Sequence, residues 1–401
     1  MSHSKVTNPY YTFGVLYKSD NFIKWENGQT EKFKAYRKAW VDHVYESDPG
    51  RFPLNLNVEA TTRCNLECTF CTHSSLEENQ VGDIDLESSK RIIDEAKNFG
   101  GLPTINVNGL GEPLLRKDIP EFIGYAKEHG VQDVMFHTNG TIMTEELATR
   151  LIESGLDRII FSVDSPDKAT YEKMRPLKTS FDKYKDVEGA VQKGTPWEKT
   201  VRNVHRFIDV RNKMGMKKPI VRVTMVVTNN TVYQVQDFIN LWKPVVDHIT
   251  VQDLTWRTKL LNNGTWSNKE SSALPTNFEE IREESIKRNI KFVCPYLYQS
   301  VYQFYGGDVI PCSNPNARTH MIMGRWDKTL MAEVWHGKEY QDIRSLHENG
   351  KWFEHPICGT CEVALIELFK GMVKQGIKFK SSSIEESDVP YVGEDMESST
   401  Q

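Results

Sequence analysis

Short stretches in which apolar and polar residues alternate are separated by longer amphipathic stretches through the middle of the chain. Alternation is typical of β-strands, and a repeat of three or four residues is typical of helices. The expected strands are residues 54–60, 104–108, 133–139, 158–164, 220–228 and 248–254. The expected helices are residues 86–99, 119–129, 145–154, 201–214 and 233–242. This repetition predicts an α/β fold in which helices cover the outside of a parallel sheet.

The predicted strands carry polar side chains on one face and branched apolar side chains on the other. Successive strand residues point to opposite faces. The apolar face must pack on the helices, so the polar face is expected to line the inside of the sheet, which we call the lumen. An ordinary (β/α)8 barrel fills this space with branched apolar side chains. The polar set is Asn55, Asn57, Glu59, Asn106, Asn108, His137, Asn139, Ser162, Asp164, Arg222 and Thr224.

A polar lumen needs polar occupants, because a buried polar group without a hydrogen-bond partner is costly. Two kinds of occupant satisfy this requirement. The first is a cofactor together with a polar substrate, and the second is a set of mutual side-chain hydrogen bonds with water. The pattern by itself leaves both open.

Composition and charge exclude several classes of protein. The chain has 401 residues, enough for one large domain and a smaller one, and a net charge of -5 with acids and bases mixed along it. The sequence shows no cluster or stripe of lysine and arginine of the kind that binds nucleic acid. Residues 1–5 lack the apolar region of a signal peptide, and an apolar run long enough to span a membrane is absent. We expect a cytoplasmic protein with neither a nucleic acid nor a membrane as partner.

Three cysteines stand directly after the first expected strand. Cys64, Cys68 and Cys71 form a C-x3-C-x2-C run. The chain's seven cysteines are odd in number and closely spaced, which favours metal ligation in a reducing compartment over disulfides. Three thiolates on a four-iron cube leave one iron open to a small molecule. A three-ligand zinc site or a structural thiol site is the alternative.

The run resembles the cysteine loop of the radical S-adenosylmethionine (SAM) enzymes. The resemblance implies a partial (β/α)6 barrel similar to a TIM barrel. It also implies a [4Fe–4S] cluster whose open iron binds the amino and carboxylate groups of SAM. Reductive cleavage of SAM then yields a 5′-deoxyadenosyl radical that abstracts hydrogen from the substrate. The same resemblance implies an external one-electron reductant of the flavodoxin or ferredoxin type, and contact between the backbone of Phe70 and the adenine.

The ends of the next strands hold the other residues that the resemblance assigns to SAM. Gly109, Gly111 and Glu112 follow the second strand, where the glycines permit close approach and the carboxylate is expected to bind the methionine amino group. A tight turn before a helix-starting proline is the alternative. Thr138, Asn139, Ser162 and Asp164 end the third and fourth strands and match contacts to the ribose and methionine parts of SAM. An Asn-Gly turn and a capping aspartate are the alternatives there.

A second cysteine set lies near the C-terminal end. Cys294, Cys312, Cys358 and Cys361 are spaced C-x17-C, 45 residues, then C-x2-C. This region resembles the auxiliary-cluster domain of the SPASM/twitch class. Four thiolates complete the ligation of one [4Fe–4S] cluster, whereas full SPASM domains usually hold two clusters. A four-cysteine zinc knuckle is the alternative.

The three thiols of the first cysteine set and the four of the second account for all seven cysteines. No cysteine is then left to return a hydrogen atom to a substrate radical. This favours dehydrogenation over epimerisation. The chain resembles the aminocyclitol and sugar dehydrogenases and epimerases of aminoglycoside pathways. We expect oxidation of a secondary alcohol in a small polar substrate, with the electron passing to the auxiliary cluster. The alternatives are epimerisation with a donor such as tyrosine, maturation of a ribosomally made peptide, and a non-enzymatic iron–sulfur redox sensor.

The catalytic base is not identified by any motif. Its candidates are Arg222, Asp253, Arg257 and Tyr296, each of which is also a plausible substrate contact or surface pair.

The expected domains are an N-terminal arm at 1–53, with a helix at 31–45 and no clear strand set, the radical barrel at 54–260 with an insertion at 165–200, the auxiliary domain at 290–370 and a disordered tail at 382–401.

Overall fold

Six parallel strands form the centre of the computed structural model, which describes residues 6–7, 13–76, 80–178, 192–228, 230–253 and 278–377. The first five each pair in parallel with the next of the six along the chain. The sheet stays open, because an antiparallel strand continues it at one edge and a parallel one at the other, which confirms the predicted partial barrel. The six strands are β3 Asn55–Val58, β4 Thr104–Val107, β5 Asp133–Thr138, β6 Arg158–Ser162, β7 Ile220–Val227 and β8 His248–Asp253.

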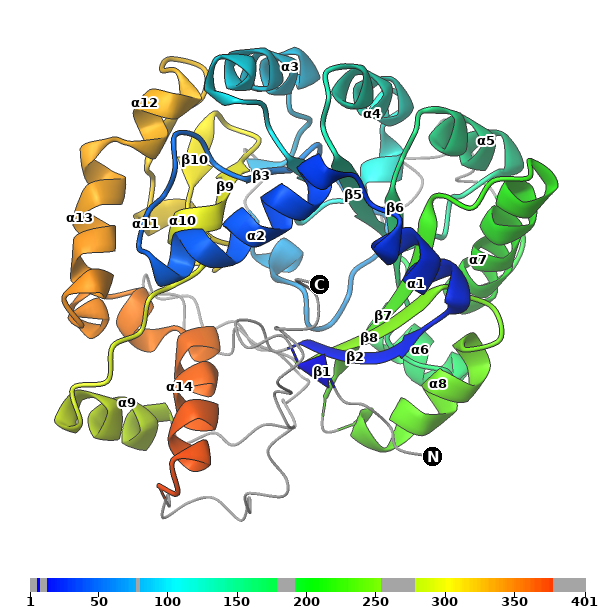
Figure 1. Ribbon diagram of the computed structural model, residues 1–401. Helices are drawn as coiled ribbons and strands as arrows, with labels where there is room; N and C mark the ends of the chain where they lie inside the picture. The colour runs from blue at the N-terminus through cyan, green and yellow to red at the C-terminus, as the bar shows by residue number, and fades with distance from the viewer. Residues whose placement is uncertain are drawn as a thin grey trace.

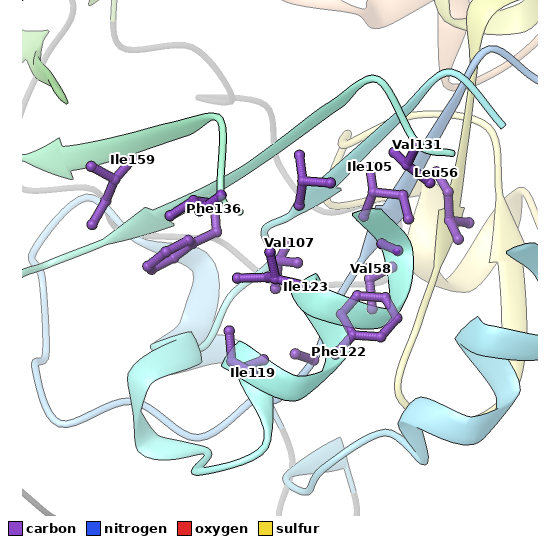
Figure 2. Close-up of a cluster of buried hydrophobic side chains, with 14 of the residues drawn as sticks. Leu56, Val58, Ile105, Val107, Ile119, Phe122, Ile123, Val131, Phe136 and Ile159 are labelled. Atoms are coloured by element: carbon purple, nitrogen blue, oxygen red, sulfur yellow. The ribbon is translucent and has the colours of Figure 1, made fainter. Parts of the chain in front are cut away.

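The helices between the strands cover the outer face of the sheet (Figure 1). Figure 2 shows Phe122 and Ile123 packed against the sheet near Val58 and Val107, so the apolar strand face points outward as predicted. The helices are α3 Leu86–Ala96, α4 Ile119–Glu128, α5 Glu145–Glu153, α6 Lys168–Met174, α7 Pro196–Lys213 and α8 Val235–Trp242.

Helix α7 begins five residues earlier than the sequence pattern predicts. Thr195 caps its N-terminus, Glu198 completes a capping box and Pro196 occupies the first turn. These cap residues, rather than the apolar repeat, set the start of the helix. Together with α6, this first turn occupies part of the segment predicted as an insertion at 165–200, of which residues 179–191 lie outside the described residues.

The N-terminal arm contributes strands, which the sequence analysis did not expect. It contains β1 Val6–Thr7, β2 Phe13–Lys18, α1 Asp20–Asn27 and, as predicted, α2 Glu31–Tyr45. Strand β2 pairs antiparallel with β8. Figure 1 shows α1 and α2 lying across the barrel, and the Tyr36 hydroxyl of α2 reaches Asp133 at the start of β5 (3.4 Å). The expectation of no strand set failed because β2, which lies between β1 and β8, does not strictly alternate apolar and polar residues.

The C-terminal part extends the same sheet. Strand β9 pairs in parallel with β3, and β10 and β11 follow as antiparallel neighbours. One eleven-stranded sheet therefore joins the arm, the barrel and the second cysteine region. The elements here are α9 Phe278–Lys287, α10 Tyr296–Gln299, β9 Ser300–Gln303, β10 Asp308–Ile310, α11 Ala317–His320, β11 Gly324–Arg325, α12 Met331–Trp335, α13 Lys338–Glu348 and α14 Glu362–Lys374.

Two further observations concern the extent of the chain. No helix within the described ranges has both the length and the apolar character needed to cross a membrane. The predicted tail at 382–401 lies outside the described residues, as does the end of the strand predicted at 248–254.

A buried side-chain amide joins β9 to helix α3. The side-chain amide of Gln303 donates to the Ser88 hydroxyl (2.9 Å) and accepts from the Ser89 hydroxyl (2.7 Å), both on α3. The backbone carbonyl of Gln303 accepts from the backbone amide of Glu59 (3.0 Å). We expect Gln303→Leu to lower the free energy of unfolding by about 1–3 kcal/mol, because it removes the acceptor of a buried hydroxyl. Denaturant unfolding measures this effect.

The control for this variant is Gln236→Leu, at an exposed position of α8 where the amide contacts only Asn240. Its effect should stay within about 0.5 kcal/mol. Equal effects of the two substitutions would contradict a special role for the Gln303 junction.

Candidate active site

The first cysteine run forms a loop directly after β3 that is held by backbone hydrogen bonds from two sides. The Thr62 amide donates to the Gly82 carbonyl (2.9 Å) on one side. On the other, the amides of Glu67 and Thr69 donate to the carbonyls of Pro176 and Met174 (both 2.9 Å). The loop is therefore a built part of the fold, with a conformation imposed by segments far along the chain.

The three thiols of this loop lie in a buried environment. Burial raises the pKa of Cys68 to about 12, Arg175 acts in the opposite direction, and the neighbouring Cys71 adds to the rise. Burial also raises the pKa of Cys64, with the next contributions from Cys68 and Glu112. Thiols held in this way are unreactive nucleophiles by themselves, whereas a bound metal centre stabilises their deprotonated form.

Glu112 is brought together with Thr138 and Asn139 by direct hydrogen bonds. Its Oε1 accepts from the Thr138 hydroxyl (2.7 Å) and the Leu114 amide (3.1 Å), and its Oε2 accepts from the Asn139 amide (2.7 Å). Burial raises the pKa of Glu112 to about 7, while these hydrogen bonds act in the opposite direction. The Asn139 side chain also donates to Asn65 (2.8 Å), beside the first cysteine, so the group supports the cysteine loop.

The glycines before Glu112 are required by the packing of the chain against itself. A Cβ at Gly111 would lie 2.1 Å from the carbonyl oxygen of Thr61, and one at Gly109 would lie 2.6 Å from the side chain of Glu59. The Glu112 amide donates to the Arg63 carbonyl (2.8 Å), which fixes this approach. Both glycines therefore have a structural role in placing the Glu112 loop against the cysteine loop.

Asp164 forms a buried ion pair with Arg175, and its Oδ1 accepts from the Val226 amide (2.7 Å). The Arg175 guanidinium lies 5.4 Å from the ring centroid of Phe70, so it joins the fourth strand end to the cysteine loop. Ser162, the last residue of β6, is in register with Thr224 of β7. Sequence reasoning missed Arg175, because a lone arginine in a presumed insertion carries no signal of burial.

The lumen is polar, and some of its polar atoms are unsatisfied. Among the described residues, buried atoms without a hydrogen-bond partner include Oδ1 of Asn55, Oδ1 of Asn106, Nε of Arg222 and Nε2 of His248. Met135 and Ile160 are apolar exceptions on this face, since each is in register with a polar lumen residue. These orphaned atoms favour a polar occupant over a lumen satisfied by its own side chains.

Glu59 links the lumen to the second cysteine region. Its carboxylate is fully buried and forms an ion pair with Arg318 of α11, in which Nη1 lies 3.0 Å from Oε2. The amide of Leu110 donates to the same carboxylate (3.2 Å). Arg318 itself lies over the ring of Phe304, 3.9 Å from the centroid. A charge pair thus joins the two parts that each carry a cysteine set.

The second cysteine set converges from three places in the chain. Burial raises the pKa of Cys358, with further contributions from Cys294, Cys312 and Cys361. Burial likewise raises the pKa of Cys294, followed by the effects of Cys312 and Cys361. The four thiols are therefore near enough to act on one another. No three Cys, His, Asp or Glu side chains in the described ranges are arranged to hold a single metal ion.

Tyr302 is a lumen residue that the sequence analysis did not identify. It is in register with Asn57 on the neighbouring β3, so both point to the same face. It also acts on the second cysteine set, since Cys312 and Cys294 contribute to its raised pKa after the dominant effect of burial. The only signal in the sequence was its place between Cys294 and Cys312.

The candidates for the catalytic base are dispersed. Arg222 lies on the lumen face of β7, and Tyr296 lies beside Tyr302 with their ring centroids 6.2 Å apart. Asp253 is the last residue of β8, and its side chain is outside the described structure, as is the whole of Arg257.

Comparison with protein families places two domains on this arrangement. The Radical SAM superfamily matches residues 58–240, and the iron-sulfur cluster-binding domain SPASM matches residues 294–362. The chain therefore carries a radical SAM domain and a SPASM domain, as the resemblance of its two cysteine sets implied. Its cofactors are SAM, the [4Fe–4S] cluster of the radical SAM domain and the auxiliary iron–sulfur centre of a SPASM domain.

Individual relatives differ in what they do. A probable GTP 3′,8-cyclase of Methanococcus maripaludis is 31% identical in an alignment that spans 41% of this chain and 58% of the cyclase. The cofactor-modifying protein of the tungsten-containing aldehyde ferredoxin oxidoreductase of Pyrococcus furiosus is 24% identical over 77% of this chain and 87% of its own length. SuiB of Streptococcus suis, solved with its precursor peptide SuiA, has a TM-score of 0.56 at 16% identity, covering 82% of this chain and 74% of SuiB, and shares the fold.

The close approach at Gly111 predicts a sensitive position. Gly111→Ala should lower the free energy of unfolding by about 1–3 kcal/mol, because its methyl group meets backbone atoms that cannot move aside easily. It should also lower the iron bound after anaerobic reconstitution, since the cysteine loop carries the clashing carbonyls. Thermal unfolding and iron analysis measure the two effects.

Gly124→Ala is the matched control, because a Cβ at this position of helix α4 meets nothing within 4 Å. That substitution should be neutral or stabilise the protein by up to about 1 kcal/mol. Normal iron content in Gly111→Ala would contradict the coupling between the two loops.

Proposed function

We propose that this radical SAM enzyme is an oxidoreductase that oxidises a secondary alcohol of a small polar substrate, of the sugar or aminocyclitol class. The observation that carries the proposal is the division of the seven thiols. Three lie in the loop after β3, and the other four converge beside β9, the parallel neighbour of β3. Every thiol then has a cluster to bind, and the second cluster has a full ligand set that suits an electron acceptor.

The thiols fit the clusters by their chemistry. Cys64, Cys68 and Cys71 are the ligands we assign to the SAM-binding cluster, and Cys294, Cys312, Cys358 and Cys361 are those of one auxiliary [4Fe–4S] cluster. Each thiolate on a four-iron cube binds a different iron, so the sulfur atoms stand farther apart than around a single ion. When bound and reduced, the first cluster with SAM supplies a 5′-deoxyadenosyl radical that removes a hydrogen atom from the substrate.

The residues around the cysteine loop are suited to holding SAM. Glu112, fixed by Thr138 and Asn139, supplies a buried carboxylate beside the first cysteine. On the other side, Arg175 offers a cation that Asp164 orients and that lies over Phe70. We assign these residues, with Gly109, Gly111 and Ser162, to the SAM-binding wall of the lumen.

The oxidation balances with the groups available. The substrate carbon loses a hydrogen atom to the radical, its hydroxyl loses a proton to a base on the lumen wall, and one electron passes to the oxidised auxiliary cluster. The parallel contact of β9 with β3 supports this route, because it sets the acceptor site beside the barrel. A flavodoxin- or ferredoxin-type protein would supply the electron that SAM cleavage consumes.

A second candidate function is epimerisation with Tyr302 as hydrogen donor. Its place on the lumen face, beside the second cysteine set, favours this alternative to a thiol donor. In this reaction the phenol would return a hydrogen atom to the opposite face of the substrate carbon, and the tyrosyl radical left behind would take up an electron from the external flavodoxin- or ferredoxin-type reductant and a proton from solvent. Dehydrogenation needs no such donor.

Iron content tests the assignment of the clusters. Reconstituted protein should bind about eight irons per chain, four for each cube. Cys361→Ser should lose about half of this iron and lose product formation, because the acceptor is gone. Cys64→Ser should lose a similar amount together with all release of 5′-deoxyadenosine. A wild-type protein with about four irons and one tightly bound zinc would contradict the proposed electron acceptor.

Product mass tests the reaction. Anaerobic incubation with a panel of sugars and aminocyclitols in deuterated buffer should yield a product lighter by about 2 Da, the loss of one hydrogen atom and one proton. The product should form in step with 5′-deoxyadenosine. A product with one solvent deuterium and no loss of hydrogen would instead identify the epimerase, and Tyr302→Phe should then lose the deuterium.

A further inference from the structure

Four residues form one row across the inside of the sheet. His137 of β5 is in register with Ile160 of β6, Ile160 with Arg222 of β7, and Arg222 with His248 of β8. Neighbouring strands lie about 4.8 Å apart, so Arg222 stands beside His248 and two strands from His137. Residues in register on adjacent strands point to the same face, which here is the lumen.

Arg222 is an ion without a partner in the described part of the chain. Its Nε is buried and has no hydrogen-bond partner, and no carboxylate forms an ion pair with it. Arg158, on the neighbouring strand β6, offers a direct contrast. Its guanidinium pairs with Asp133, with Nε 2.9 Å from Oδ1, and lies over the ring of Trp25. Of two arginines in the same lumen, one is neutralised and the other is not.

Within the described ranges, the other charged and titratable groups around Arg222 do not supply a counter-ion. Burial and then Arg158 lower the pKa of Arg222 to about 9, with Asp133 acting weakly in the opposite direction. Burial and then Arg222 lower the pKa of His137 to about 3 and also lower that of His248. The two imidazoles are therefore neutral and can donate or accept hydrogen bonds. At neutral pH the row keeps the positive charge of Arg222.

Arg222 is half-buried with its Nε fully buried, and a guanidinium that is partly withdrawn from water without a counter-ion is destabilising. An arginine fork matches the two oxygens of a carboxylate or a phosphate, which bind it through paired hydrogen bonds. We propose that Arg222, flanked by His137 and His248, binds an oxyanion of the substrate inside the lumen. This inference rests on the proposed oxidation and narrows its substrate to an acidic polyol, a sugar acid or sugar phosphate, rather than an aminated sugar.

The opposite wall of the lumen complements such a ligand. Oδ1 of Asn55 and Oδ1 of Asn106 are buried acceptors without donors, on β3 and β4. Their amide nitrogens are already used, by Ser300 (3.2 Å) and Asn57 (3.2 Å) respectively. Substrate hydroxyls would satisfy these two oxygens while the acid group rests on Arg222. The ligand is thus expected to be anionic at one end and hydroxylated at the other.

The melting temperatures of two methionine variants test whether the Arg222 guanidinium lacks a counter-ion. Full-length reconstituted protein is melted anaerobically in chloride buffer as wild type, Arg222→Met and Arg158→Met. Arg222→Met should melt higher than wild type, by about 2 °C or more, because it removes a partly desolvated ion that has no counter-ion in the described part of the chain. Arg158→Met, the matched control, should melt lower, because it leaves the buried Asp133 unpaired. A lower melting temperature for both variants would overturn the proposal.

Titration with anions tests the binding. Sodium acetate and sodium phosphate, each replacing chloride at constant ionic strength, should raise the melting temperature of the wild type by about 2 °C or more but not that of Arg222→Met. A response to acetate alone assigns a carboxylate, and one to phosphate alone assigns a phosphate. A wild type that responds to neither anion, or a variant that responds equally, would overturn the proposal.

SAM carries a carboxylate of its own, so its binding is measured in the same samples. Loss of SAM affinity in Arg222→Met would show that the guanidinium serves the cofactor and would overturn the assignment to the substrate. None of these measurements requires turnover. Failure of the anion site therefore leaves the iron and product-mass tests of the oxidation intact, and failure of those tests leaves the anion result readable.

Discussion

The parallel pairing of β9 with β3 is the contact on which the arrangement of both cysteine sets depends. Strand β3 leads into the first cysteine loop, and β9 lies between Cys294 and Cys312. Backbone hydrogen bonds between two adjacent strands fix their relative position within a fraction of an ångström, more firmly than surface side chains would. The Glu59–Arg318 ion pair adds a side-chain link near this junction, and the buried Gln303 amide ties β9 to helix α3. A displaced β9 would separate the second cysteine set from the barrel.

The second constraint is the inverted polarity of the barrel. The apolar faces of the strands are used up in packing on α3 to α8, so the space inside is lined with amides, hydroxyls and charged groups. Such a lining lowers the free energy of unfolding when its polar groups lack hydrogen-bond partners. A polar ligand that supplies those partners raises the free energy of unfolding, so the same residues couple stability to ligand binding. The N-terminal helices contribute to this enclosure, since Tyr36 contacts Asp133 and Phe22 packs on His248.

Several site residues could be predicted because they belong to short motifs or to periodic strands. The cysteine spacings, the Gly109–Glu112 turn and the alternation that placed Arg222 in the lumen all depend on neighbours within a few residues. Arg175, Tyr302 and Arg318 could not be found in this way, because each gains its role from contact with a segment remote in sequence. The antiparallel strand β2 was missed for the same reason, since only its pairing with β8 makes it a strand.

The amino-acid sequence alone determined the class of chemistry and the repeating architecture. Thiol spacing and the period of apolar residues are local properties that survive without knowledge of the fold. The tertiary structure decided which polar groups are satisfied and which are not. Arg158 and Arg222 look alike in the sequence, both in strands that line the lumen. Only the arrangement of β5, β6 and β7 gives Asp133 to the first and leaves the second without a counter-ion among the residues that the structure describes.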